Sequence, residues 1–174
     1  TSVINASLVI SDEISLNNLL NKIMKIIIEN SGSQIGAILL KDKNTLNVEI
    51  SYDVSSGENM EIQKSIELPE TIINYVKRSE QNVIFNSSES FGFSLFKDDK
   101  YMKNYKPKSI FCLPIVYKKN SLGLLYLENR NIENLYTKEK IEILKLFSSQ
   151  AAISIDHAKL FKQTIEHTNL LEQT

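Results

Sequence analysis

The sequence has no tryptophan and few cysteines, histidines, prolines and glycines, with one, two, three and five of these in 174 residues. A single cysteine, Cys112, excludes an intramolecular disulfide framework and a cysteine cluster for zinc, and it fits a reducing cytoplasmic location. An excess of one charge is also missing, because 20 Lys and Arg face 21 Asp and Glu. Without a basic field, binding to nucleic acid or to an anionic membrane is disfavoured.

Long hydrophobic runs are absent as well. The dense apolar stretch at residues 16–28 is interrupted by Asn or Lys at five positions, whereas a membrane-spanning helix needs roughly 20 mostly apolar residues. No basic segment followed by an apolar run marks a signal peptide. We therefore expect no membrane insertion in this segment, and the first residue, which is not Met, indicates a fragment of a longer protein.

The residues that are present have the composition of one globular domain, with 42 % hydrophobic and 24 % charged residues. Apolar residues at helical spacing within residues 1–11 predict the end of an upstream connecting helix, which the polar residues 11–13 interrupt. Ser15 is positioned to cap a second helix, and Gly32 is positioned to end it.

Two strand–turn–strand patterns follow. The first covers residues 35–40 and 46–50, and the second covers residues 109–117 and 122–128. Gly123 predicts a bulge or a close approach of another backbone, and Pro114 predicts an edge or irregular position, since proline lacks the N–H of a ladder.

Between these hairpins the pattern is more mixed. Apolar residues at Ile62, Ile66 and Leu68 predict a third strand, Pro69 opens a short helix that reaches Arg78, and residues 83–85 form another strand. Residues 86–108 are polar with scattered aromatics and predict a long loop that acts as a candidate lid. Thr137 caps a last helix, from residue 138 to beyond 171. Hairpins with helices at the ends favour an antiparallel α+β fold.

The order and spacing of several segments resemble a GAF domain of the kind found in large bacterial proteins that join kinase-like and ATPase regions to a sensor histidine kinase. The segments are Ile10-Ser11-Asp12-Glu13-Ile14-Ser15-Leu16 with Leu19-Leu20, Pro69 with Ile73 and Tyr75-Val76, Lys97-Asp98-Asp99-Lys100-Tyr101, Ser109-Ile110-Phe111-Cys112-Leu113-Pro114-Ile115, Leu122-Gly123-Leu124-Leu125-Tyr126-Leu127-Glu128-Asn129, and Ser149-Gln150-Ala151-Ala152-Ile153-Ser154-Ile155. The resemblance spans nearly the whole chain.

This resemblance implies a six-stranded antiparallel sheet with the N- and C-terminal helices on one face and a pocket under short helices and loops on the other. It places the domain at residues 12–160, between the connecting helix at 1–11 and a C-terminal signalling extension at 161–174. The implied function is a non-catalytic regulatory sensor and dimerisation module of a cytoplasmic signal-transduction protein of the histidine kinase type. A ligand-free structural spacer is the alternative, and a cyclic-nucleotide-binding domain is less favoured.

The motifs narrow the choice of ligand without naming one. Cyclic-nucleotide GAF domains carry Asn-Lys, a later Phe and then Asp-Glu, and the matching residues here are Asn129-Arg130, Tyr136 and Lys140-Ile141. A cation thus replaces the acidic residue. Covalent bilin binding is disfavoured because no His follows Cys112 and a cysteine inside an apolar run behaves as a small hydrophobe.

Haem or another metal is disfavoured because His157 and His167 both fall in the last helix, ten residues apart, and cannot chelate as neighbours. The cofactor therefore stays unknown. Asp98-Asp99 and Cys112 are the groups that an enzyme would use, but no nucleophile, base and orienting residue accompany them. No catalytic residue is assigned, and capping or solvation is favoured for the two aspartates.

Two sets of residues are predicted to carry the function. The first lines a small-molecule pocket: Ile72, Tyr75, Phe93, Phe96, Tyr101, Ser109 and Cys112. The second follows an alternating three–four spacing along the last helix and forms a homodimer interface together with the N-terminal helix: Ile141, Leu144, Ala151, Ile155, Ala158 and Ile165. Packing within one chain is the alternative for the second set.

Overall fold

The computed structural model describes residues 2–54 and 66–172, with side chains described for 16–54 and 66–171. The elements in chain order are α1 (Ser2–Ser31), β1 (Ile35–Asp42), β2 (Thr45–Asp53), α2 (Glu70–Ser79), β3 (Val83–Phe85), the short 3-10 helix η1 (Phe93–Phe96), α3 (Lys100–Tyr105), β4 (Ser109–Tyr117), β5 (Asn120–Asn129) and α4 (Lys138–Glu172). Strands and helices are therefore mixed without regular alternation, which confirms the α+β class.

The strands form one antiparallel sheet in the order β2-β1-β5-β4-β3. The described residues contain five strands where six were predicted. Part of the predicted third strand, including Ile62, lies outside the described residues, while Ile66 and Leu68 are described and are not in a strand. Both predicted hairpins are confirmed.

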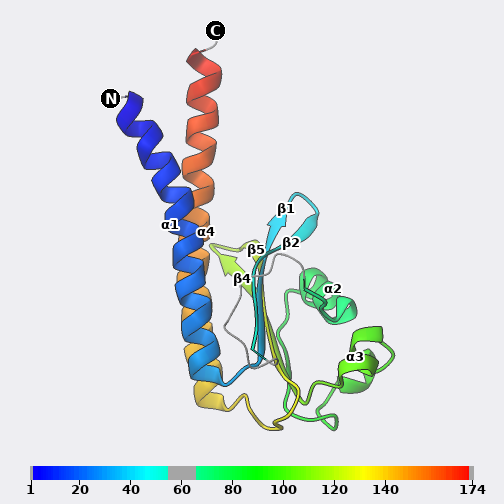
Figure 1. Cartoon of the computed structure of the whole chain (residues 1–174). Helices are drawn as coiled ribbons and strands as arrows, with labels where there is room; N and C mark the ends of the chain where they lie inside the picture. Colours follow the sequence, from blue (N-terminus) through cyan, green and yellow to red (C-terminus); the bar gives the residue numbers. More distant parts are fainter. Residues whose placement is uncertain (1, 55–65, 173–174) are drawn as a thin grey trace.

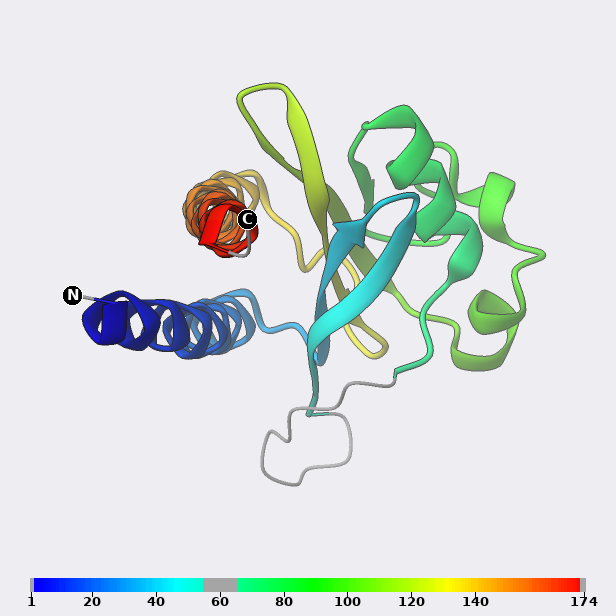
Figure 2. The same ribbon diagram turned by 90° about the horizontal axis from the view of Figure 1, so that it is seen from above.

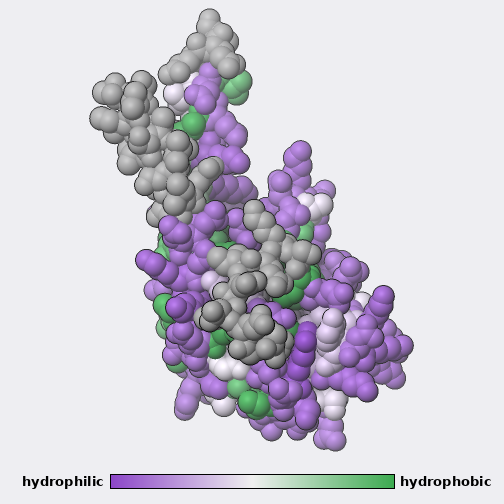
Figure 3. All heavy atoms as spheres, in the orientation of Figure 1, coloured by the Kyte–Doolittle hydropathy of each residue, from purple (hydrophilic) through white to green (hydrophobic). Residues whose placement is uncertain are grey.

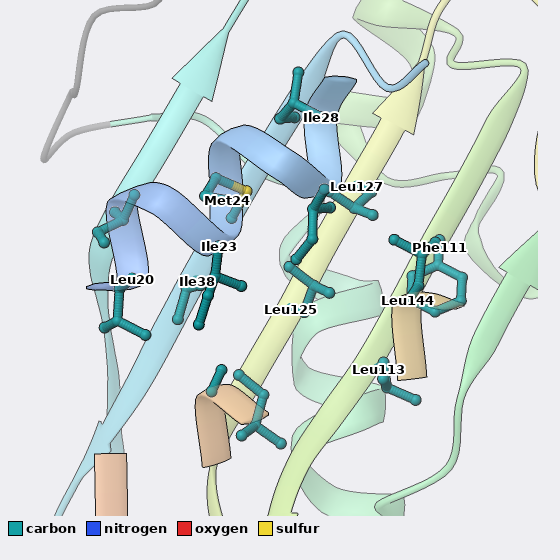
Figure 4. Close-up of a cluster of buried hydrophobic side chains, with 14 of the residues drawn as sticks. Leu20, Ile23, Met24, Ile28, Ile38, Phe111, Leu113, Leu125, Leu127 and Leu144 are labelled. Carbon is teal, nitrogen blue, oxygen red and sulfur yellow. The ribbon is translucent and has the colours of Figure 1, made fainter. Parts of the chain in front are cut away.

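Helices cover both faces of this sheet (Figures 1 and 2). The long helices α1 and α4 pack against each other and against one face, whereas α2, η1 and α3 lie on the other. Figure 4 shows the first core, in which Met24, Leu125 and Leu144 bring together α1, the sheet and α4. Strand side chains alternate between faces, so Leu125 enters this core while Tyr126 enters the second one.

The N-terminal helix differs from the prediction, because α1 is continuous through Ser11, Asp12 and Glu13. The predicted break at these residues is wrong. In a helix, a polar residue costs from a few tenths to about 0.7 kcal/mol relative to Ala. The helix α1 contains no Gly or Pro, which would cost more and could interrupt it. The helix ends where Gly32 adopts a positive φ of 75°.

Residues 86–108 also differ from the predicted irregular loop, because they contain η1 and α3. Other local predictions are confirmed. Thr137 accepts the backbone N–H of Lys140 at 3.3 Å and caps α4. Pro114 lies in β4 beyond the reach of β3, which pairs with residues 110–112 only. A Cβ atom on Gly123 would lie 2.0 Å from the carbonyl oxygen of Leu39, so only glycine fits.

Among residues 2–54 and 66–172, none of the helices combines the length and the apolar character that crossing a bilayer requires.

Candidate functional site

A groove of about 1070 Å³ lies between the β1–β2 hairpin and the helices α2 and α3. Its apolar floor includes Leu39 and Val48 from the hairpin, and Tyr101 forms part of the α3 side. Polar side chains line the rim, among them Asn104 and Asp98. The groove lies on the sheet face opposite α1 and α4, where the resemblance places a ligand pocket.

The helix α3, which forms one wall, is fixed at its start by a carboxylate. Asp99 caps α3 by accepting the backbone N–H of Tyr101 at 2.7 Å. The same carboxylate accepts the backbone N–H of Thr71 at 3.0 Å and its hydroxyl at 2.6 Å, which ties α3 to the first turn of α2. Burial raises the pKa of Asp99, but these hydrogen bonds outweigh it and hold the pKa below its ordinary value.

The face of α3 is attached to the sheet by a buried polar cluster. Glu128, near the end of β5, is fully buried, and Tyr101 and Tyr126 both donate hydrogen bonds to its Oε1, the second at 2.9 Å. Arg130 Nε donates to the other carboxylate oxygen at 3.0 Å, and its Nη2 donates to the Tyr101 hydroxyl at 3.1 Å. The guanidinium also lies 4.0 Å from the ring centre of Tyr105, within cation–π range.

Burial dominates the electrostatics of this cluster. It raises the pKa of Glu128, although the hydrogen bonds from Tyr101 and Tyr126 and the charge of Arg130 oppose the change. The pKa of Tyr101 is raised mainly by burial and further by the neighbouring Glu128. Burial and the neighbouring Glu128 also raise the pKa of Tyr126, so both tyrosines stay protonated and donate to the buried carboxylate.

The residue after Glu128 connects this cluster to the terminal helices. Asn129 Nδ2 donates to the carbonyl of Gly32, at the end of α1, at 2.9 Å, and the backbone N–H of Gln34 donates to the carbonyl of Glu128 at 2.8 Å. The start of α4 is held at the same place, since Lys140 Nζ donates to the carbonyl of Ser31 at 3.3 Å. The end of β5 thus contacts α3 and α1 directly, and it is connected to α4 through α1.

The predicted pocket residues separate into four groups. Tyr101 lines the groove, whereas Tyr75 and Phe96 line a smaller cleft of about 690 Å³ beside α2. Ile72 and Cys112 belong to the second apolar core, which also contains Tyr126, and Phe93 packs against that core. None of these three residues lines either cavity. Ser109 lies apart from them and donates a hydrogen bond to the carbonyl of Ile132 at 2.7 Å.

The predicted interface residues divide in a similar way. Leu144, Ala151 and Ile155 are buried in the core of the single chain, so that face of α4 packs against the sheet and α1. Ile141, Ala158 and Ile165 are half-buried. The alternative prediction, packing within one chain, therefore describes these first three positions. The antiparallel helix α1 and the sheet already bury them, so their side chains are not available to a second copy.

The residues weighed for cofactors have other surroundings. Cys112 is fully buried, and burial raises the pKa of its thiol. His157 and His167 are exposed on α4, away from the groove. Within the described part of the chain, no three His, Cys, Asp or Glu side chains come together as a metal site.

The residues that match the cyclic-nucleotide motif make contacts inside the protein. Besides Asn129 and Lys140, described above, Tyr136 is fully buried and its hydroxyl pairs with that of Ser33 at 2.8 Å. Arg130 is engaged with Glu128. These residues therefore organise the junction of α1, β5 and α4.

Sequence reasoning missed the role of Glu128 and Arg130. The signal was present, because Glu128 follows Tyr126 by two residues on a strand and must face the same side of the sheet. A carboxylate on the buried face of an apolar strand demands partners.

Comparison with known proteins agrees with this architecture. The sequence model of the GAF domain family matches residues 15–155, and the chain belongs to the GAF domain family. The GAF domain region of a protein from Geobacter sulfurreducens PCA superposes with a TM-score of 0.66 at 18 % identity, covering 84 % of this chain and 97 % of that one. The resemblance inferred from sequence is thereby confirmed.

Two curated relatives indicate the setting of the domain. Hybrid signal transduction histidine kinase G of Dictyostelium discoideum is 44 % identical over 91 residues, 52 % of this chain and 3 % of that protein. Histidine protein kinase 1 of Candida albicans is 28 % identical over 171 residues, covering 93 % and 7 %. The chain spans less than a tenth of the length of either relative. The chain is therefore a GAF domain similar to short segments of signal-transduction histidine kinases.

Proposed function

We propose that this domain is a non-catalytic sensor of a cytoplasmic histidine kinase, which dimerises through its terminal helices and relays occupancy of the groove to them. One observation carries the proposal. Tyr101 lines the groove and also donates to Glu128, whose own strand end contacts the C-terminal end of α1.

The physical reason for a relay is the cost of leaving Glu128 without a partner. A ligand that displaces Tyr101 removes one donor from a buried carboxylate, which costs about 1–3 kcal/mol unless the carboxylate moves. Movement of Glu128 shifts Asn129 and therefore the contact with Gly32. A coupling free energy of 1–3 kcal/mol is typical of allosteric proteins.

A thermal-shift screen with nucleotides and small metabolites tests whether the groove binds a ligand. A compound at about 100 times its Kd stabilises the native state by about 2.7 kcal/mol, which raises the Tm by roughly 5–10 °C for a domain of this size. The shift should vanish in Asn104→Trp, which fills the groove, and persist in Lys103→Trp, an exposed neighbour on α3 that does not line it.

The two outcomes separate two functions. A shift that Asn104→Trp abolishes supports the sensor. Absence of any shift across the screen favours the ligand-free spacer, in which the groove is only a surface feature and the terminal helices provide the function.

A further inference from the structure

A second cleft, of about 690 Å³, lies between α2 and η1. Tyr75 and Phe96 line it, and their rings meet edge-on with centroids 5.6 Å apart. Leu95 also lines it and is 74 % exposed. Small-molecule sites have volumes of about 300–1,000 Å³, so this cleft has room for one small organic molecule.

The charges that line the cleft are all positive. Lys77 and Arg78, in the last turn of α2, are its only charged lining residues in the part of the chain that the structure describes. Lys77 donates a hydrogen bond to the carbonyl of Asn44. The Arg78 side chain is exposed and forms no hydrogen bond or ion pair with another described residue. The end of a helix carries about half a negative charge, so two full positive charges leave the cleft net positive.

The larger groove on the other side of α2 has the opposite balance of charge. The two cavities share Thr71, Asn74 and Lys77. The groove adds one lysine and four carboxylates: Lys100, Glu67, Glu70, Asp98 and Asp99. Four carboxylates against two lysines make its lining negative. An anion is therefore attracted to the cleft and repelled from the groove.

Leu95 is exposed on a surface of a different character. The side of the molecule that carries α2 and α3 is mostly hydrophilic (Figure 3). In η1, Phe96 is buried and Phe93 packs against the second core, while Leu95 points away from it. A ligand that covers Leu95 removes apolar surface from water, which favours binding in proportion to the area covered.

We infer that this cleft binds a small organic anion with an aromatic body. The aromatic body lies against Tyr75, Phe96 and Leu95, and the anionic group, a carboxylate, sulfonate or phosphate, pairs with Arg78. A guanidinium suits this role because its planar fork of donors matches such groups. The site is separate from the groove and independent of the proposed relay.

A fluorescent dye, anilinonaphthalene sulfonate, tests the site because it joins an aromatic body to one sulfonate and brightens when it leaves water. In a titration of the domain, Arg78→Gln should raise the Kd of the dye at least fivefold. The matched control Lys97→Gln, which removes an exposed cation outside the cleft, should change the Kd less than twofold.

Two further comparisons separate the apolar contact from the charge. Leu95→Ser should raise the Kd of the dye at least threefold, whereas Phe91→Ser, at a fully exposed residue outside the cleft, should change it less than twofold. Phenylnaphthylamine has the same rings without the sulfonate. It should bind more weakly than the sulfonate dye, and Arg78→Gln should not alter its Kd.

Equal Kd values for Arg78→Gln and Lys97→Gln would overturn the inference, as would the absence of a fluorescence rise at millimolar dye. Asn104→Trp, which fills the groove, should leave the titration unchanged, and loss of dye binding in this variant would contradict the cleft as the site. All five substituted residues are exposed, and circular dichroism checks that each variant folds. A thermal-shift screen that finds no groove ligand leaves these titrations unaffected, so the two proposals fail separately.

Discussion

The phenol of Tyr101 in α3 donates a hydrogen bond to the fully buried carboxylate of Glu128 at the end of β5. The two residues are 27 positions apart, and their contact joins the wall of the groove to the strand that holds α1 in place. Replacing Tyr101 with Phe keeps the ring and removes the hydroxyl, which donates to Glu128 and accepts from Arg130 Nη2. We expect the free energy of unfolding, measured with urea, to fall by about 1–3 kcal/mol.

Tyr105→Phe is the matched control for that substitution. Its hydroxyl donates to the exposed Glu67, so the loss should leave stability nearly unchanged. An equal loss in both variants would contradict the special role given to the buried contact.

The raised pKa of Glu128 predicts a pH dependence with a definite sign. Because the folded state binds the proton of Glu128 more tightly than the unfolded state does, its contribution to stability is greatest below the ordinary pKa of 4.5 and decreases as pH rises through the folded pKa. Glu128→Gln cannot titrate. Urea unfolding from pH 4.5 to 7.5 should therefore show wild type losing stability relative to Glu128→Gln as pH rises. A relative gain would show that the folded pKa is lowered instead.

The two neighbouring aspartates should respond very differently to substitution. Asp99 caps α3 and binds Thr71, whereas Asp98 is exposed at the rim of the groove. Asp99→Ala should lower the free energy of unfolding by about 1–2 kcal/mol, the usual cost of a lost N-terminal cap. Asp98→Ala should have almost no effect on thermal or urea unfolding. Similar losses in both would mean that the cap contributes nothing.

Gly123→Ala should be among the most damaging single substitutions in the sheet. The added Cβ would lie 2.0 Å from the Leu39 carbonyl oxygen, so β1 and β5 must separate. Overpacking of this kind costs roughly 3 kcal/mol. Ser121→Ala, in the same strand, is the control, and urea unfolding compares the two. A loss below about 1 kcal/mol would show that the strands adapt.

The sequence predicted the structural features that depend on local patterns of residues. Apolar runs joined by short polar segments predicted both hairpins, Thr137 marked the start of α4, and Pro114 and Gly123 indicated an edge and a close approach. The helices within residues 86–108 were missed because they are only four and six residues long, too short to show periodicity.

The functional residues were harder to predict because they depend on contacts between distant segments. Tyr101 was expected in the pocket for its place in the chain, but its partner Glu128 is visible only once α3 packs on β5. Apolar residues lie on more than one face of α4, so the sequence alone does not show which face is buried. In the structure Leu144 and Ile155 are buried within the chain, while Leu146 and Leu160 remain exposed.

Hydrogen exchange at the end of α1 tests the relay most directly. The backbone N–H of Gly32 bonds to the carbonyl of Ile28, and that of Gln34 bonds to the carbonyl of Glu128, so neither group is bonded to the hydroxyl of Tyr101 itself. Under native conditions, Tyr101→Phe should speed their exchange at least threefold, because local opening reports the stability of that region, while Tyr105→Phe leaves it unchanged. Faster exchange confined to α3, with Gly32 and Gln34 unaffected, would contradict the relay from groove to helix.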